Sequence, residues 1–136
     1  MKIEPTYVTF EQAELFEEKG LECHSECNQW LLAKDKEDDS KRFICLNSEL
    51  DSYTQIDEDT YHNHYHCLTI PEQWQVIEWL RINHGIWIGV ELYHNMDGKL
   101  FSSFIQTNNK KQSFNGNKTP QEAYSVAFDY ILKELI

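Results

Sequence analysis

Three segments of the chain combine a helix start signal with apolar residues at helical spacing. In the first, Thr9 is followed three residues later by Gln12, the pattern of a capping box. The helix that this pattern predicts runs to about Lys19, and Gly20 offers the left-handed stop. Its apolar stripe consists of Phe10, Ala13 and Phe16, with Leu15 beside them.

The second helix is predicted to start at Thr69-Ile70-Pro71-Glu72, because threonine is again followed by an acid three residues later and proline is tolerated in a first turn. It ends at Asn83-His84-Gly85. Its apolar residues are Trp74, Ile77 and Leu80, and we expect Trp74 to belong to the core.

The third helix starts at Thr119, with Pro120 at its first position and Glu122 at its third. Together these residues form a strong start signal. One face of this helix is apolar and consists of Tyr124, Ala127, Phe128, Ile131 and Leu135.

Alternating apolar and polar positions predict strands between the helices. Residues 86–92 place Ile86, Ile88, Val90 and Leu92 on one face, and Trp87, Gly89, Glu91 and Tyr93 on the other. A turn at 95–98 leads to a returning strand at 99–107, and a shorter strand follows at 111–114. In the first half, 29–33 and 42–46 predict a hairpin around the loop 34–41, residues 47–60 an irregular stretch, and 61–68 another strand.

These elements predict a single α+β domain over 1–136, with an antiparallel sheet and helices packed on one face, since each element is apolar on one side. The order in the second half is helix–strand–strand–strand–helix, which resembles the double-stranded-RNA-binding domain over about half the chain. That family places a basic cluster at the start of its last helix, where this chain has Lys118 as its one base. We therefore expect no direct nucleic-acid binding.

Composition supports one packed core, because 40% of the 136 residues are hydrophobic and 13% are aromatic. No apolar run approaches the ~20 residues of a membrane span, and the N-terminus lacks the apolar region of a signal peptide. We expect a cytoplasmic protein whose four cysteines stay reduced.

The negative charge lies almost wholly in the first half. Residues 1–59 hold 16 acidic and 6 basic side chains, a net charge of −10, whereas residues 60–136 hold 7 and 6, a net charge of −1. We therefore distinguish an acidic half, 1–68, from a scaffold half, 69–136. An acidic surface repels phosphates and attracts basic partners, although solubility alone also accounts for such runs. The acidic runs proposed as partner-binding are Glu37-Asp38-Asp39 and Asp57-Glu58-Asp59.

Aromatic residues are the second candidate for partner binding. Trp79 lies five residues after Trp74, about 140° around the helix, so we expect it to face solvent or a second chain. If helices cover the isoleucine face of the sheet, Trp87 and Tyr93 belong to an exposed aromatic surface of the kind favoured at binding hot spots. The alternative is that the N-terminal segment packs on this face and buries Trp87.

Taken end to end, the sequence resembles small uncharacterised proteins encoded by phages and prophages of gut Bacteroidales. This resemblance covers both ends and the centre of the chain, and not residues 23–67. It implies a small protein made inside an infected bacterium, where accessory proteins commonly bind a host factor. The stretches that carry it are Met1–Pro5 with Thr9–Ala13, Pro71–Arg81 with Asn83–Ile88, and Thr119–Tyr124 with Phe128–Leu132.

Two small constellations could hold a ligand. Zinc requires four thiolate or imidazole ligands, which Cys23, Cys27, His64 and His66 could supply, although scattered histidines and reduced thiols explain the same residues. A basic group near the last helix start could hold an anion such as a nucleotide phosphate, or could be an ordinary connecting loop. This group consists of Arg81, Lys110, Lys111 and Lys118.

No G-x-S-x-G, H-E-x-x-H, P-loop or G-x-G-x-x-G pattern is present, so we expect no enzyme. The leading hypothesis is a non-catalytic phage accessory protein that binds and inhibits a host, defence-related protein through its acidic and aromatic surface. The alternatives are a sequestering protein for a small nucleotide signal and a zinc-stabilised structural module. A homo-oligomer is compatible with each of them.

Overall fold

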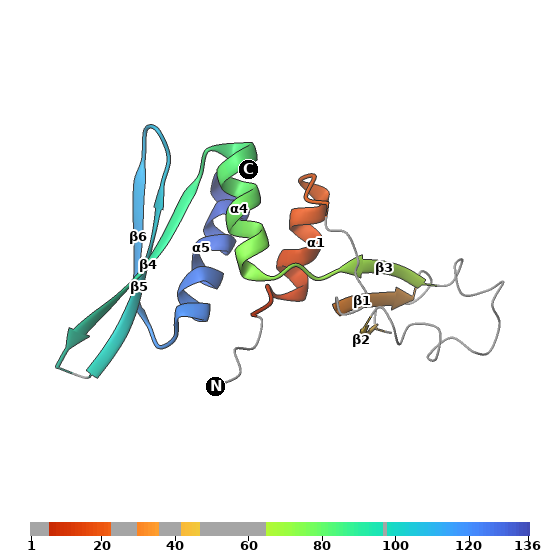
Figure 1. Ribbon diagram of the computed structural model, residues 1–136, viewed down its shortest axis with the longest axis horizontal. Coiled ribbons are helices and arrows are strands. Elements are labelled where there is room, and N and C mark those ends of the chain that lie inside the picture. The colour runs from red at the N-terminus through yellow and green to blue at the C-terminus, as the bar shows by residue number, and fades with distance from the viewer. Residues whose placement is uncertain (1–5, 23–29, 36–41, 47–64, 97) are drawn as a thin grey trace. The chain divides into compact units, whose positions relative to one another are not determined.

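The computed structural model describes residues 6–22, 30–35, 42–46, 65–96 and 98–136. The chain divides into two compact units. The larger unit comprises residues 1–21 and 72–136, and the smaller comprises residues 22–71. The first 21 residues thus group with the C-terminal half (Figure 1). The expected single domain stays a prediction, and each unit is described by itself.

The larger unit is built on a three-stranded antiparallel sheet in the order β4-β5-β6. Its strands are β4 (Trp87–Asn95), β5 (Gly98–Gln106) and β6 (Lys111–Asn117). β4 and β5 pair without interruption from Trp87 opposite Gln106 to Asn95 opposite Gly98. The pairing of β5 with β6 is irregular between Phe101 and Ser103. The alternation of the sequence predicts β4 and β5 to within a few residues, whereas β6 is longer than the predicted 111–114.

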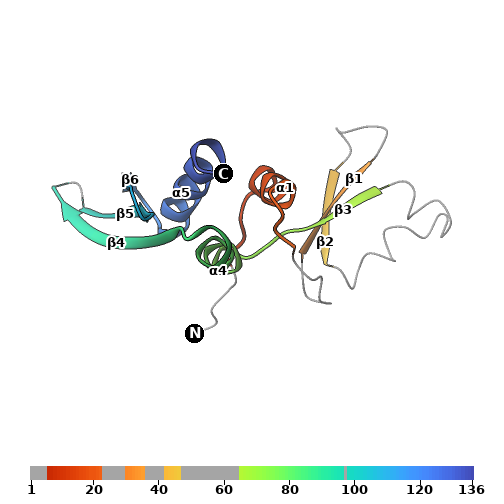
Figure 2. The ribbon, with the colours of Figure 1, turned by 90° about the horizontal axis from the view of Figure 1, so that it is seen from above.

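Helices pack on one face of this sheet, as Figures 1 and 2 show from two directions. Helix α5 (Pro120–Glu134) contacts all three strands, helix α4 (Gln73–His84) contacts β4, and helix α1 (Phe10–Glu18) packs on α5. The α+β class and the order helix–strand–strand–strand–helix are therefore confirmed. The buried apolar side chains of this unit are Val8, Ala13, Phe16, Leu21, Val76, Leu80, Ile86, Ile105, Ala123, Ala127, Phe128 and Ile131.

The packing of α1 on α5 joins an aromatic contact to a polar one. The rings of Phe16 and Phe128 meet edge to face at 5.7 Å between centroids. Beside them, the amide Nε2 of Gln12 donates to Ser125 O at 3.0 Å, Ser125 Oγ at 2.9 Å and Asp129 Oδ1 at 2.8 Å. Gln12 also closes the capping box with Thr9, because its Oε1 accepts from the Thr9 N–H at 3.1 Å. One side chain therefore both starts α1 and fastens it to α5.

Two of the three predicted helix starts are confirmed, and the other is wrong. Thr9 caps α1 and Thr119 caps α5 through their side chains. Helix α4, however, is capped by Glu72 and not by Thr69, which is the last residue of a strand and pairs with Leu31. Because the backbone of Thr69 pairs with Leu31 in a sheet, Thr69 cannot begin a helix. Gly85 ends α4 as predicted, in the left-handed conformation with φ of 63°.

The first residues of the larger unit are tied to the start of α4. The Gln73 N–H donates to Thr6 O at 2.8 Å, and Tyr7 forms a bridge with Glu72. Burial, and secondarily the charge of Glu72, raise the pKa of the Tyr7 hydroxyl above its ordinary value. Both effects disfavour the tyrosinate anion in the folded protein.

The smaller unit contains a second three-stranded antiparallel sheet, in the order β2-β1-β3. Strands β1 (Trp30–Asp35) and β2 (Arg42–Leu46) form the predicted hairpin, with Trp30 opposite Leu46. Strand β3 (Tyr65–Thr69) pairs on the other side of β1 and overlaps the predicted strand 61–68. The remainder of that prediction and the irregular stretch 47–60 lie outside the described residues.

Candidate functional site

The face of the β4-β5-β6 sheet that points away from the helices carries the exposed aromatic residues that the sequence predicts. The pairing of β4 with β5 sets Trp87 beside Gln106, Gly89 beside Phe104, and Tyr93 beside Leu100. Ile105, on the opposite face, is buried. We call the set Trp87, Gly89, Glu91, Tyr93, Leu100, Phe104, Gln106, Lys111 and Ser113 the outward sheet face.

Trp87 on the outward sheet face has 58% of its surface exposed. The alternative in which the N-terminal segment buries Trp87 therefore does not hold for the described residues 6–22. The described N-terminal residues lie on the other side of the sheet, where α1 packs against α5. An exposed aromatic side chain on a rigid strand offers contact area at low entropic cost to a partner.

The end of the Phe104 ring lies over residue 89 of the neighbouring strand, which is glycine. A Cβ added to Gly89 would come 2.1 Å from Cζ and 2.5 Å from Cε1 of Phe104. Any residue other than glycine at position 89 would clash with the Phe104 ring, so glycine is required there for the ring to keep its position. The alternation of the sequence could have indicated this neighbour, because a hairpin turn at 95–98 brings 89 opposite 104.

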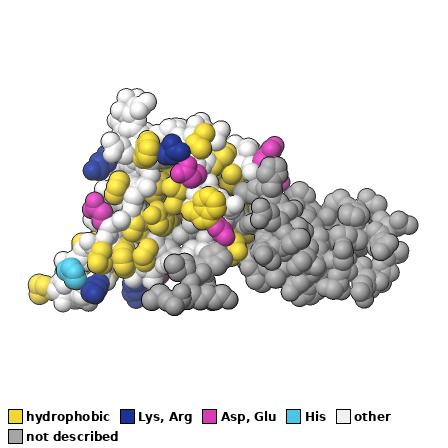
Figure 3. All heavy atoms as spheres, in the orientation of Figure 1, with side chains coloured by type: hydrophobic (Ala, Val, Ile, Leu, Met, Phe, Trp, Pro, Cys, Tyr) yellow, Lys and Arg dark blue, Asp and Glu magenta, His cyan; other side chains and the backbone are white. Residues whose placement is uncertain are grey.

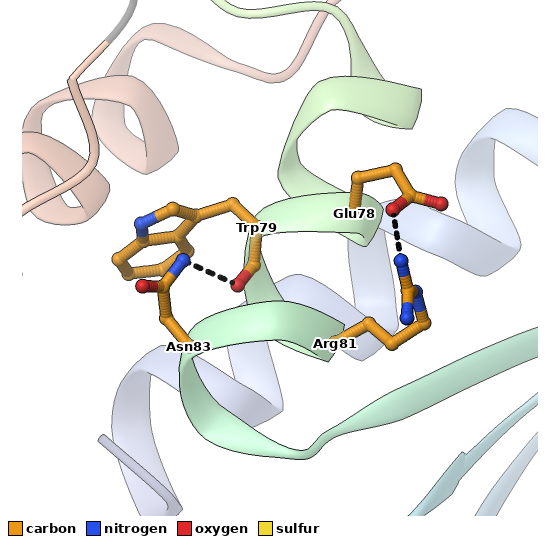
Figure 4. A network of polar contacts seen from close by, with 4 residues as sticks. All are labelled: Glu78, Trp79, Arg81 and Asn83. Carbon is orange, nitrogen blue, oxygen red and sulfur yellow. Dashed lines mark hydrogen bonds and ion pairs between the residues drawn. The ribbon is translucent and has the colours of Figure 1, made fainter.

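Each of these two rings has a cation near it. The guanidinium carbon of Arg81 lies 5.5 Å from the centre of the Trp87 ring, and Lys111 Nζ lies 5.5 Å from the centre of the Phe104 ring. Both distances are within the range of cation–π attraction. Arg81 also bonds Glu78 at 2.7 Å (Figure 4). The Arg81 side chain is therefore held at two points beside the outward sheet face.

Tyr93 spans the sheet from β4 to β6. Its hydroxyl oxygen accepts a hydrogen bond of 2.8 Å from the Gly116 N–H. Tyr93 is only partly exposed as a result, and the hydrogen bond fixes its orientation. The predicted partner-binding residues Trp87 and Tyr93 thus lie on one face, as the sequence indicates.

The predictions for the two tryptophans of α4 are reversed in the structure. The buried positions of α4 are Gln73, Val76 and Leu80, so Trp74 falls outside this stripe and is 60% exposed, with its Nε1 donating to Glu72. Trp79 follows Val76 by three residues and flanks the stripe. Its ring meets Phe16 of α1 at 6.0 Å and His84 at 4.7 Å.

Figure 4 shows the resulting division of α4. Trp79 and Asn83 point toward α1, and the Asn83 amide donates to Trp79 O at 3.1 Å. Glu78 and Arg81 point to the other side of the helix. Trp79 thus packs between α4 and α1 and is only partly exposed, and its role in partner binding stays a prediction.

The four bases of the predicted anion site do not all lie on one side of the sheet, since Arg81 and Lys111 lie at the outward sheet face and Lys110 does not. Lys110 Nζ donates to Tyr130 Oη on α5 at 2.7 Å, on the helix side of the sheet, whereas Lys111 reaches Phe104 on the outward sheet face. The hydrogen bond with Tyr130, first among several causes, raises the pKa of the Lys110 ammonium. At the start of α5, the Lys118 N–H donates to the Glu122 carboxylate at 2.9 Å. A carboxylate of the helix itself therefore occupies the position in which an anion would bind.

The other predicted sites fall on parts of the chain that are not described. Glu37, Asp38, Asp39, Asp57, Glu58, Asp59, Cys23, Cys27 and His64 lie outside the described residues, as does the side chain of His66. Among the residues that the structure describes, no group of three or more histidine, cysteine or acidic side chains could hold a metal ion. The zinc hypothesis therefore stays a prediction.

Comparison with known proteins gives no indication of function, so a function is inferred from the outward sheet face. No protein-family model, curated protein or solved structure matches the chain. Within the described parts of the chain, no helix has both the length and the apolar character needed to cross a membrane.

Proposed function

We propose that the protein is a non-catalytic phage accessory protein that binds and inhibits a host, defence-related protein. The observation that supports this proposal most directly is the outward sheet face, on which Trp87 is 58% exposed while helices cover the opposite face. The resemblance to phage proteins of gut Bacteroidales supports the cellular setting, the cytoplasm of an infected bacterium.

The residue types on and beside this face suit protein recognition. Tryptophan, tyrosine and arginine are the residues most enriched among binding hot spots. Trp87, Tyr93 and Arg81 are all present, and two of them are already immobilised, Tyr93 by Gly116 and Arg81 by Glu78. Binding then costs little further side-chain entropy, because the side chains are ordered before the partner arrives.

The charge of the chain determines the kind of host protein that we expect. The net charge of the chain is −11, and residues 1–59 contribute −10 to this total. A field of this sign accelerates encounter with a basic protein surface and disfavours nucleic acid. In this proposal the acidic runs attract the partner, while the outward sheet face supplies the short-range contacts.

Capture of host proteins with two matched tryptophan variants tests the proposal. Trp87→Ala removes an exposed tryptophan from the outward sheet face, and Trp74→Ala removes an equally exposed one from α4. We expect a host protein that is retained by the wild type and by Trp74→Ala. Its binding to Trp87→Ala should be weaker by about thirtyfold, the effect of losing a hot spot of about 2 kcal/mol.

Two further results decide the matter. Raising the salt concentration should weaken capture, because long-range attraction between charges is screened. Inhibition should be visible as lost activity of the purified host protein when the wild type is added. A partner that binds both tryptophan variants equally would show that the outward sheet face is not the binding surface.

A further inference from the structure

The two edges of the β4-β5-β6 sheet differ in how they are protected against pairing with another strand. β6 pairs irregularly with β5, contains Gly116 with φ of 85° and begins with Lys111. Irregular pairing and charged residues are the usual means of blocking an edge. β4 is nine residues long, pairs regularly along its whole length with β5, and contains neither proline nor lysine. Long, regularly paired edges without proline or lysine favour strand addition.

β4 also exposes large apolar side chains on both faces of the sheet. Trp87 on the outward sheet face is 58% exposed, and Leu92 on the opposite face is 52% exposed. Met96, directly after the strand, is fully exposed. Figure 3 shows hydrophobic side chains gathered over this part of the molecule. Leu92 lies on the face that the helices cover, yet it stays half exposed near the hairpin tip.

We propose that a second copy of the chain pairs with β4 in antiparallel orientation, with the two-fold axis near Leu92. In this register Leu92 faces Leu92 of the other copy, Val90 faces His94, and Glu91 faces Tyr93. Glu91 is the one carboxylate in β4, and the register keeps the two copies of Glu91 from facing each other. A two-fold axis at Glu91 would instead place them opposite each other.

A second copy fits this edge because β4 is complementary to itself. Within the β4-β5-β6 sheet each copy offers one regularly paired edge, β4, and pairing uses that edge in both copies, so an assembly built on this sheet closes as a dimer. The Leu92 side chains cover each other on the helix side. The outward sheet faces of the two copies join, which doubles the aromatic surface available to a partner.

Salt separates this proposal from the proposed function. Each copy carries a net charge of −11, so the copies repel each other, and screening should strengthen a dimer held by backbone hydrogen bonds and apolar contacts. Binding of a basic host protein should weaken under the same change. Either proposal can therefore fail while the other stands.

Sedimentation of the full chain over a wide concentration range, at low and high salt, tests the dimer. We expect a monomer–dimer equilibrium that shifts toward dimer at high salt. Leu92→Lys places two ammonium groups opposite each other and should raise the dimer dissociation constant by at least about tenfold. Ile82→Lys is the matched control, because Ile82 is an apolar residue of α4, outside β4, that is 68% exposed, and its substitution should leave the equilibrium unchanged.

A photo-crosslinking residue separates loss of pairing from loss of folding. Placed at position 92 it should link two chains to each other, and placed at Asn115 on β6 it should not. A protein that stays monomeric at every concentration and salt level overturns the proposal. So does a dimer that survives Leu92→Lys and crosslinks from position 115.

Discussion

The ring of Phe104 occupies the space that a side chain at residue 89 would fill. A Cβ on Gly89 would lie 2.1 Å from Phe104 Cζ, well inside van der Waals contact. The two residues face each other in the pairing of β4 with β5. Neither can therefore change without consequence for the other, and the shape of the outward sheet face depends on the pair.

Gly89→Ala should destabilise the fold, by about 1 to 3 kcal/mol, because the new methyl group displaces the Phe104 ring. The free energy of unfolding in urea measures this loss. In a Phe104→Ala background the same glycine substitution should cost much less, since the ring is gone. An equal cost in both backgrounds would show that the ring does not lie where the structure places it.

Gln12→Ala should lower the free energy of unfolding by about 2 kcal/mol, because it removes bonds to Ser125 and Asp129 and leaves buried polar atoms without their partner. Gln12 is 1% exposed, so water cannot easily take its place. Glu18→Ala, on the exposed side of α1, is the control and should change stability by less than about 0.5 kcal/mol. Similar losses for the two variants would contradict the role of Gln12 as the fastening between helices.

Ser103→Ala should leave the fold as stable as the wild type or more stable. Ser103 is fully buried in β5, and its Oγ has no hydrogen-bond partner among the described residues. A buried hydroxyl without a partner costs free energy, and alanine removes it without opening a large cavity. Thermal unfolding measures the change. A marked loss of stability would indicate that Oγ has a partner, such as a buried water molecule.

Tyr7 should make the wild type sensitive to alkaline pH. The pKa of its hydroxyl is raised in the folded state, so the unfolded chain loses its proton first as pH rises. The contribution of Tyr7 to stability is therefore fully present below its ordinary pKa of 10.0, and it is lost as pH rises through the folded value.

Unfolding measured from neutral pH to above pH 10 checks this expectation against Tyr7→Phe, which cannot ionise. The difference in stability between wild type and Tyr7→Phe should shift against the wild type as pH rises through this range. Glu72→Gln should lower the pKa of Tyr7 slightly, because the charge of Glu72 is the secondary cause of its elevation. A pH-independent difference between wild type and Tyr7→Phe would contradict the raised pKa.

The comparison of α1 with α4 shows how far local signals reach. The Thr9 and Gln12 pattern predicts the start of α1 correctly, because a capping box forms between residues three apart. The same kind of pattern at Thr69 fails, because Thr69 pairs with Leu31 in a strand. Strand pairing of Thr69 with Leu31, which is distant in the sequence, overrides the local helix-capping signal.

For the candidate site, the sequence by itself determined which residues lie on the two faces of β4, because side chains alternate along any strand. It also determined the caps at Thr9 and Thr119 and the stop at Gly85, which depend on atoms a few residues apart. Trp87 and Tyr93 were therefore identifiable before the structure was known.

Only the tertiary structure decided what those residues meet. It packed Trp79 of α4 on α1 and left Trp74 exposed. Each of these outcomes depends on packing between elements that are far apart along the chain, and the spacing of residues within one element carries no information about such partners.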